Sequence, residues 1–146
     1  AFTLDSCGRS SYLISPFFAC LRSAADMIKG IGVDVVDIER FEESLARTPG
    51  MRERLFTEDE LATSQDRHPS FLAGRFAAKE ALAKALGVPE GLAWHDVNVH
   101  RADNGAPILE LTGIAKQRAG TGKIHLSISH DGPVVVAMIV IENPRG

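Results

Sequence analysis

The longest helical pattern in this chain is FLAGRFAAKEALAKAL, from Phe71 to Leu86. Apolar residues occupy most of its circumference, and a helix of that kind is buried. Four charged residues interrupt the pattern: Arg75, Lys79, Glu80 and Lys84. An ionised side chain among Phe and Ala needs an opposite charge or a bound ion, because burying it alone would cost several kcal/mol. Glu80 and Lys84 share one face at four-residue spacing, which in an ordinary helix indicates a surface ion pair but here favours a functional site.

The segment before this helix predicts a strand and two short helices. Residues 27–34 are rich in Ile, Val and Gly, as in a buried strand whose glycines allow close backbone approach. Asp37 can cap a helix that ends at residues 48–50. Thr57, with Glu60 three residues later, matches a capping box and starts another short helix.

The boundaries of the long helix and the second half of the chain follow from turn residues. Ser70 is the expected helix cap, and Gly87 with Pro89 ends the helix. A turn at residues 103–105 joins two strands in a hairpin. The predicted elements of this half are the strands 97–100 and 108–111, a helix at 112–119, and the strands 124–129 and 134–141. The expected product is an α+β domain in which a mostly antiparallel sheet packs against one long helix.

Size and charge exclude several classes of function. With 146 residues and 45% hydrophobic content, the chain fits one compact domain. Its net charge is −3, from 16 basic and 19 acidic residues. No broad basic field is therefore available to hold nucleic acid by counterion release, and a nucleic-acid partner is not expected.

Residues 1–26 differ in composition from the rest of the chain. Their apolar run at 12–21 is about half the length of a membrane span, and no signal-peptide pattern precedes it. We interpret residues 1–26 as a leader, tag or extension and place the domain at residues 27–146. An organellar transit peptide is a minor alternative. The cysteines, Cys7 and Cys20, both fall in this segment, so the domain itself is thiol-free, and a cytoplasmic protein without membrane contact is expected.

Two further polar positions complete a candidate site. Asp34 ends the first strand, and because Asp37 is available as the helix cap, Asp34 is free for another task. His130 follows a predicted strand, whose Ser127 and Ser129 share one face and suggest a polar rim. Carboxylates, cations and an imidazole together suit a magnesium ion bridging to phosphate oxygens. The sequence therefore predicts magnesium-dependent chemistry on a phosphorylated cofactor.

Three segments, taken in order, resemble the holo-acyl carrier protein synthase family: residues 30–34 (GIGVD) with Arg40, residues 71–81 with Lys84, and residues 127–131 (SISHD). The resemblance spans residues 27 to about 142. It implies a phosphopantetheinyl transferase-like fold and a reaction that moves the phosphopantetheine group of coenzyme A to a serine of apo-acyl carrier protein. Adenosine 3',5'-bisphosphate is released, and magnesium is required. The hairpin also resembles that of the family, although Ala106 stands where some members carry a basic residue.

The resemblance assigns expected roles to five of the residues already singled out. It implies that Asp34 and Glu80 bind the magnesium ion and that Lys84 and His130 contact the coenzyme A phosphates, assisted by Arg75. Attack of a hydroxyl group on phosphorus depends on charge neutralisation and positioning, so Glu80, Lys84 and His130 are the expected catalytic set. Our leading hypothesis for removal of the serine proton is Glu80 acting through a water on the magnesium ion.

The same resemblance implies partners. Arg40 would lie on the face that meets the acidic carrier protein. The active enzyme would be a homotrimer with sites between adjacent subunits, working in lipid metabolism such as fatty acid biosynthesis, although a polyketide carrier protein is an open alternative.

Two other interpretations remain at this stage: a nucleotide pyrophosphatase, which would use water as the attacking group, and a catalytically silent coenzyme A-binding module. The combination of Asp34, Glu80 and Lys84 argues against the silent module.

Overall fold

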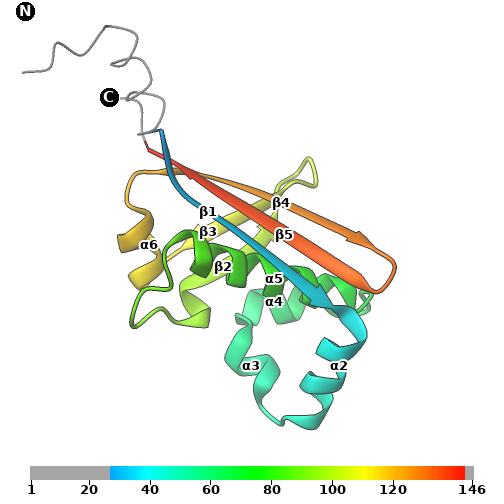
Figure 1. Ribbon diagram of the computed structural model, residues 1–146. Helices are drawn as coiled ribbons and strands as arrows, with labels where there is room; N and C mark the ends of the chain where they lie inside the picture. The colour runs from blue at the N-terminus through cyan, green and yellow to red at the C-terminus, as the bar shows by residue number, and fades with distance from the viewer. Residues whose placement is uncertain (1–26, 144–146) are drawn as a thin grey trace, which may run out of the picture.

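The structure, a computed structural model, describes residues 27–143, so the leader proposed at residues 1–26 lies outside it. It is an α+β fold with two antiparallel sheets and a set of helices (Figure 1). The larger sheet has the order β1-β5-β4, and its strands are β1 (Ile28–Asp37), β4 (Lys123–Asp131) and β5 (Val134–Glu142). The smaller sheet is the hairpin of β2 (Val97–Arg101) and β3 (Pro107–Leu111). The helices are α2 (Ile38–Arg47), α3 (Met51–Leu55), α4 (Glu58–Thr63), α5 (Ser70–Ala85), α6 (Gly113–Ala119) and the 3-10 turn η1 (Trp94–Asp96).

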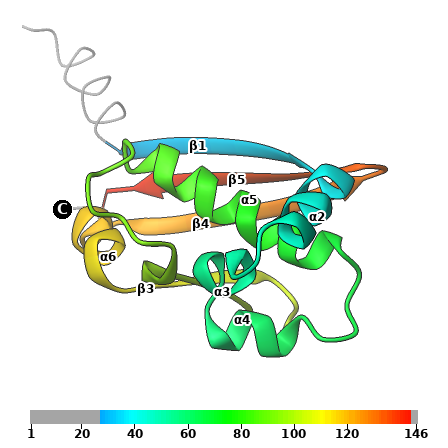
Figure 2. The same cartoon turned by 90° about the horizontal axis from the view of Figure 1, so that it is seen from below.

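Helix α5 runs along one face of the larger sheet and forms the centre of the core (Figure 2). Ala77, Ala81 and Leu82 are fully buried there. Two glycines on the inner face of β1 allow the close approach. A Cβ atom at Gly32 would overlap the backbone oxygen of Ala81, and one at Gly30 would overlap the backbone oxygen of Ala85. The expected role of these glycines is thus confirmed, and it brings Asp34 on the same strand next to α5.

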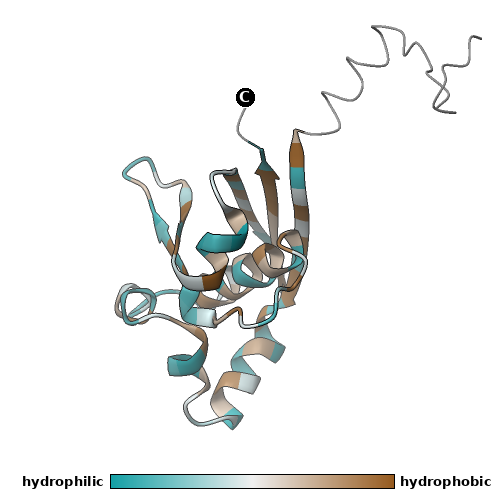
Figure 3. Ribbon diagram, turned by 90° about the vertical axis from the view of Figure 1, so that its left-hand side faces the viewer, coloured by the Kyte–Doolittle hydropathy of each residue, from teal (hydrophilic) through white to brown (hydrophobic). Residues whose placement is uncertain are grey.

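The opposite face of the larger sheet is open, and it is apolar along β1 and β5. The strands alternate, so residues two apart share a face. On β1, Ile31, Val33 and Val35 are 59%, 52% and 60% exposed, and Met138 on β5 is 47% exposed. The helices of the described chain lie on the other side (Figure 3). We call Ile31, Val33, Val35 and Met138 the open sheet face.

Local capping signals in the sequence are mostly confirmed. Asp37 caps α2 by accepting a hydrogen bond from the N–H of Arg40 at 2.9 Å, and Thr57 with Glu60 forms the predicted capping box of α4. The prediction for Ser70 is wrong, because α5 already begins at Ser70 and Pro69 occupies the cap position without a side-chain hydrogen bond. Proline is favourable at a helix start because its φ is preset and it lacks an N–H that would need a partner.

The predicted antiparallel pairing is confirmed, but the prediction gave one sheet where the structure has two. All strand pairs are antiparallel, but the hairpin β2–β3 forms a sheet of its own. Helix α3 had no counterpart in the predicted elements. No helix between residues 27 and 143 has the length and apolar character needed to cross a bilayer.

Candidate functional site

Three elements bring predicted site residues to one cavity of about 360 Å³. Asp34 comes from β1, Arg40 from α2 and Glu80 from α5, and all three line it. We call this cavity the carboxylate pocket. Lys84 lies one turn beyond Glu80, and its Nζ donates to Asp34 Oδ1 at 2.8 Å and to the Val33 carbonyl at 3.0 Å. Lys84 is therefore ion-paired with Asp34, a residue far away in the sequence.

Two of the three carboxylates that line this pocket, those of Asp34 and Glu80, influence each other, whereas Asp37 caps α2. Burial raises the pKa of Glu80 above its usual value, the nearby charge of Asp34 raises it further, and Lys84 partly offsets both effects. In the part of the chain that the structure describes, no group of three or more His, Cys, Asp or Glu side chains could hold a metal. An ion here would thus rely on two carboxylates and on ligands from outside the chain, as magnesium commonly does with phosphate oxygens.

This pKa shift gives a first prediction for stability without divalent metal. Because the pKa of Glu80 is raised in the folded chain, its stabilising contribution is complete only below the ordinary glutamate pKa of about 4.3 and is lost as the pH rises through the folded value. Glu80→Gln should therefore have a higher Tm than wild type at pH 7, with a difference that shrinks toward pH 4. Thermal unfolding at both pH values measures this, and a lower Tm of the variant at pH 7 would contradict the stated electrostatics.

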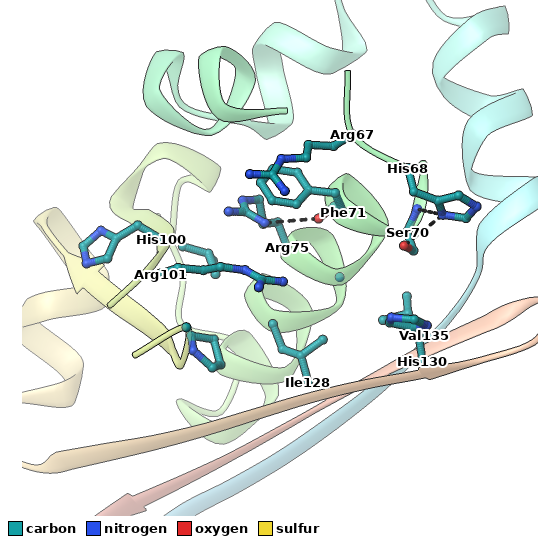
Figure 4. A pocket seen from close by; sticks show the side chains of 14 residues that line it. Arg67, His68, Ser70, Phe71, Arg75, His100, Arg101, Ile128, His130 and Val135 are labelled. Atoms are coloured by element: carbon teal, nitrogen blue, oxygen red, sulfur yellow. Dashed lines mark hydrogen bonds between the residues drawn. The ribbon is translucent and has the colours of Figure 1, made fainter. Parts of the chain in front are cut away.

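A second cavity, of about 370 Å³, lies on the other side of α5 and is lined by basic side chains. Its basic lining residues are Arg67, His68, Arg75, His100, Arg101 and His130, and within residues 27–143 no Asp or Glu lines it. Figure 4 shows Arg67, Arg75 and Arg101 near the ring of Phe71, with His68 and His130 across the cavity. We call it the cation pocket. Guanidinium groups gathered without a carboxylate form a site for an anion with several charges, such as phosphate.

Arg75 is the most constrained of these cations. Only 6% of it is exposed, its guanidinium carbon lies 3.5 Å from the centroid of the Phe71 ring, and its Nη1 donates to the Phe71 carbonyl at 3.3 Å. Burial lowers its pKa to about 10, so it stays charged at neutral pH. Its buried Nε has no hydrogen-bond partner in the described chain. An unpaired donor of this kind is costly to keep, and an anionic ligand would satisfy it.

The structure thus divides the predicted site residues into two groups. Asp34, Glu80, Lys84 and Arg40 gather on the β1 side of α5, whereas Arg75 and His130 line the cation pocket on the β4 side. Strand β5 separates β1 from β4, and the two cavities share no lining residue. Within one copy of the chain, over the residues that the structure describes, the two groups of site residues therefore stay apart.

Two sequence inferences about polar residues need correction. Lys79 does not join the other charged residues of α5, because it is 2% exposed and ion-paired with Glu60 inside the core. Ser127 and Ser129 are exposed on alternate positions of β4, on the face away from Ile128. They form no rim for the cation pocket, because residues on opposite faces of a strand point in opposite directions.

Sequence reasoning missed most of the cation pocket. Arg67 precedes the proline that starts α5, and His100 with Arg101 ends β2 just before the hairpin turn. Basic residues at the ends of elements are a weak signal, since such positions are usually solvated. They become informative only once the fold places them around Arg75.

Comparison with known proteins identifies a family of group-transfer enzymes. The family model described as "4'-phosphopantetheinyl transferase superfamily" matches residues 30–138, and the chain belongs to this superfamily.

The relatives of this chain have names that are more specific than that of the superfamily. The holo-[acyl-carrier-protein] synthase of Frankia casuarinae is 51% identical over 118 residues, which cover 79% of this chain and 98% of that protein. The holo-[acyl-carrier-protein] synthase of Salinispora arenicola is 50% identical over 121 residues, covering 80% and 99%.

Solved structures agree with this family membership. A holo-(acyl-carrier-protein) synthase from Bacillus anthracis in complex with CoA (3',5'-ADP) superposes with a TM-score of 0.69 at 35% identity, covering 81% of this chain and 99% of that one. The ACPS-CoA complex of Chronobacterium ammoniagenes gives a TM-score of 0.70 at 31% identity, with 80% and 98% covered. The predicted α+β class with its family fold is thereby confirmed.

Proposed function

We propose that this protein transfers the phosphopantetheine group of coenzyme A to a serine hydroxyl of apo-acyl carrier protein, releasing adenosine 3',5'-bisphosphate. The observation that carries the proposal is the pair of complementary half-sites on this family scaffold: a pocket of basic side chains without a carboxylate, and a pocket lined by the carboxylates of Asp34 and Glu80. Coenzyme A carries three phosphate groups, and the first pocket suits them. Its pyrophosphate, where the bond breaks, needs additional charge neutralisation, which the second pocket can supply through a cation.

Cationic side chains bind and orient the coenzyme in this proposal. Arg75 and His130 stand in the cation pocket, and Arg75 offers a buried donor that lacks a partner. Lys84 would contact phosphate from a position beside the carboxylate pocket, since its side chain is 48% exposed although it is paired with Asp34. Holding the pyrophosphate rigidly beside the carrier serine would account for much of the rate, because phosphoryl transfer depends on positioning and charge stabilisation.

The carboxylate pocket fits magnesium. Asp34 and Glu80 are close enough for the charge of Asp34 to raise the pKa of Glu80, and a divalent cation between them would relieve that repulsion. Oxygen ligands are those that magnesium prefers. When bound, the ion would neutralise charge on the pyrophosphate. Glu80 would also help to remove the serine proton, through a water rather than directly, and Lys84 would contact phosphate.

The active assembly that we propose is a homotrimer. Two observations support it: the half-sites lie on opposite sides of α5 in one chain, and the open sheet face exposes apolar side chains from two strands. Contiguous apolar surface of this kind marks an interaction site. Copies of the chain that bury the open sheet face around a threefold axis would bring the carboxylate pocket of one subunit next to the cation pocket of its neighbour.

A charge on the open sheet face should disrupt this assembly. Val33→Glu would place a carboxylate in an apolar contact and shift the protein from trimer to monomer, with loss of carrier-protein modification. Ala62→Glu, at an exposed position on α4, is the control and should leave the trimer intact. Light scattering coupled to size-exclusion chromatography measures the mass. A trimeric Val33→Glu variant would count against the proposed interface.

Arg40 is the proposed contact for the carrier protein. It is exposed on α2 and lines the carboxylate pocket with Asp34 and Glu80. A carrier protein with an acidic surface would meet this cation as its serine approaches the pyrophosphate. We further propose that the protein acts in the cytoplasm, where its proposed substrates are dissolved, and that it serves lipid metabolism such as fatty acid biosynthesis.

One incubation tests the function. The full chain is mixed with coenzyme A, magnesium and purified apo-acyl carrier protein, and the mass of the carrier protein is followed by mass spectrometry. The proposal predicts that the carrier protein gains the phosphopantetheine mass only when all components are present. Coenzyme A cleaved with an unmodified carrier protein would indicate a pyrophosphatase, and bound but intact coenzyme A would indicate a silent binding module.

A further inference from the structure

The β2–β3 hairpin carries part of the cation pocket but is not held by the larger sheet. Within residues 27–143, β2 pairs only with β3. His100 and Arg101 line the pocket from β2, whereas Arg75 lines it from α5. The spacing between these cations therefore depends on whatever fixes the hairpin against α5. With no strand pairing to do this, side-chain contacts must set it.

Glu60 provides the first of these contacts. It extends from α4, is fully buried, and accepts the N–H of Val99 through Oε1 at 2.9 Å. Its other oxygen accepts the N–H of Thr57 at 2.9 Å. Val99 lies on β2, two residues before Arg101, so Glu60 holds the backbone of β2 directly. Hydrogen bonds to an ionised acceptor are short and directional, which makes this a rigid attachment.

Lys79 connects this attachment to α5. Its Nζ lies 2.7 Å from Glu60 Oε2 and donates to the carbonyls of Leu55 at 2.9 Å and Trp94 at 3.1 Å. An ammonium group has three N–H donors, and these three acceptors match them. Trp94 belongs to η1, from which β2 begins. Lys79 therefore connects α5 to the start of β2 and to Glu60, the residue that holds the middle of β2.

A buried ion pair is a poor source of stability, because apolar side chains of similar size often stabilise as well or better. The pair instead adds directional hydrogen bonds that connect α4, α5 and β2. We propose that the Lys79–Glu60 ion pair is a positioning device that holds His100 and Arg101 at the distance from Arg75 that the phosphates of coenzyme A require. This inference rests on the proposed function for its ligand and adds the residues that set the shape of the pocket.

The decisive variant removes both charges. Lys79→Met alone leaves Glu60 buried without its cation and should lower Tm markedly. Glu60→Gln/Lys79→Met has no unpaired charge and keeps similar volumes, so its Tm should lie above that of Lys79→Met. It should stay below that of wild type, because glutamine has one acceptor oxygen for the two N–H groups that Glu60 holds. The double variant lacks the hydrogen bond from Lys79 to the Trp94 carbonyl. Its dissociation constant for coenzyme A should therefore rise about tenfold, while kcat at saturating coenzyme A changes less than about twofold. Calorimetric titration, thermal unfolding and steady-state kinetics give these quantities.

A control separates positioning from stability. Ile141→Ala creates a cavity at a fully buried position of β5, and Ile141 is not among the residues that line the cation pocket. It should lower Tm without changing the dissociation constant for coenzyme A. A control that weakens binding as much as the double variant would overturn the inference. So would a double variant that binds coenzyme A like wild type.

Two further results keep the test decisive. If the double variant does not fold, Lys79→Arg replaces it, because a guanidinium keeps the charge beside Glu60 but cannot reproduce three short ammonium contacts. Wild-type affinity in Lys79→Arg would then overturn the inference. If wild type itself binds no coenzyme A, the proposed function fails, and the inference about its pocket fails with it.

Discussion

Glu80→Gln is expected to lower the magnesium-dependent transfer rate by about a hundredfold or more while the chain remains folded. Glutamine keeps the size and one oxygen but cannot carry the negative charge that a divalent cation requires or accept the serine proton. The loss should appear in kcat, measured as formation of holo-carrier protein at saturating coenzyme A. Added magnesium should restore little of it, since the missing charge belongs to the site itself.

Glu90→Gln is the matched control for this experiment. Glu90 is exposed in the loop after α5, and the same chemical change there should leave kcat within about twofold, as expected for a surface position. A Glu80→Gln enzyme with near-normal kcat would remove both roles proposed for Glu80, in metal binding and in proton transfer. Combined with the higher Tm expected at pH 7, this variant separates catalytic from structural effects.

Gly32→Ala is expected to destabilise the fold by about 3 kcal/mol or more, the upper range for overpacking. Its new methyl group would overlap the backbone oxygen of Ala81 in α5. Because a helix backbone cannot rotate away as a flexible side chain can, β1 and α5 must separate. That separation would also move Asp34 relative to Glu80. Urea unfolding measures the loss, and transfer activity should fall with it.

Gly74→Ala provides the comparison within the same core. A Cβ there would meet a side-chain methyl of Ile128 at 3.4 Å, a contact that can relax. Alanine also favours a helix over glycine by about 0.5–1 kcal/mol. The stability of Gly74→Ala should therefore equal or exceed that of wild type. If Gly32→Ala proved equally stable, close backbone packing would not be what positions β1 on α5.

Features that depend on neighbouring residues could be predicted from the sequence. The cap at Asp37 and the capping box at Thr57 follow from hydrogen bonds over three residues. The hairpin follows from its turn, where Gly105 has a φ of 82°. The strand glycines before Asp34 correctly indicated close packing, although not its partner. Such local rules fix the elements because the interacting groups are close in the chain.

Features that depend on distant contacts could not be predicted in this way. Lys79 and Lys84 are both lysines on α5, yet Lys79 pairs with Glu60 inside the core and Lys84 with Asp34 at the surface. Helical periodicity gave no basis for separating them, since each outcome depends on an element outside the helix. The cation pocket likewise needed the hairpin to bring Arg101 next to Arg75. The division of the site between two sides of α5 could be seen only in the folded chain.

Activity of mixed trimers tests most directly whether two chains build each site. Glu80→Gln damages the carboxylate pocket and His130→Glu damages the cation pocket, so each variant alone should modify almost no carrier protein. Subunits of both kinds, co-expressed with different tags and purified as mixed trimers, should regain roughly a third of wild-type activity, because two intact halves meet at one of the three junctions in each mixed trimer. Mixed trimers as inactive as either parent would contradict the shared site.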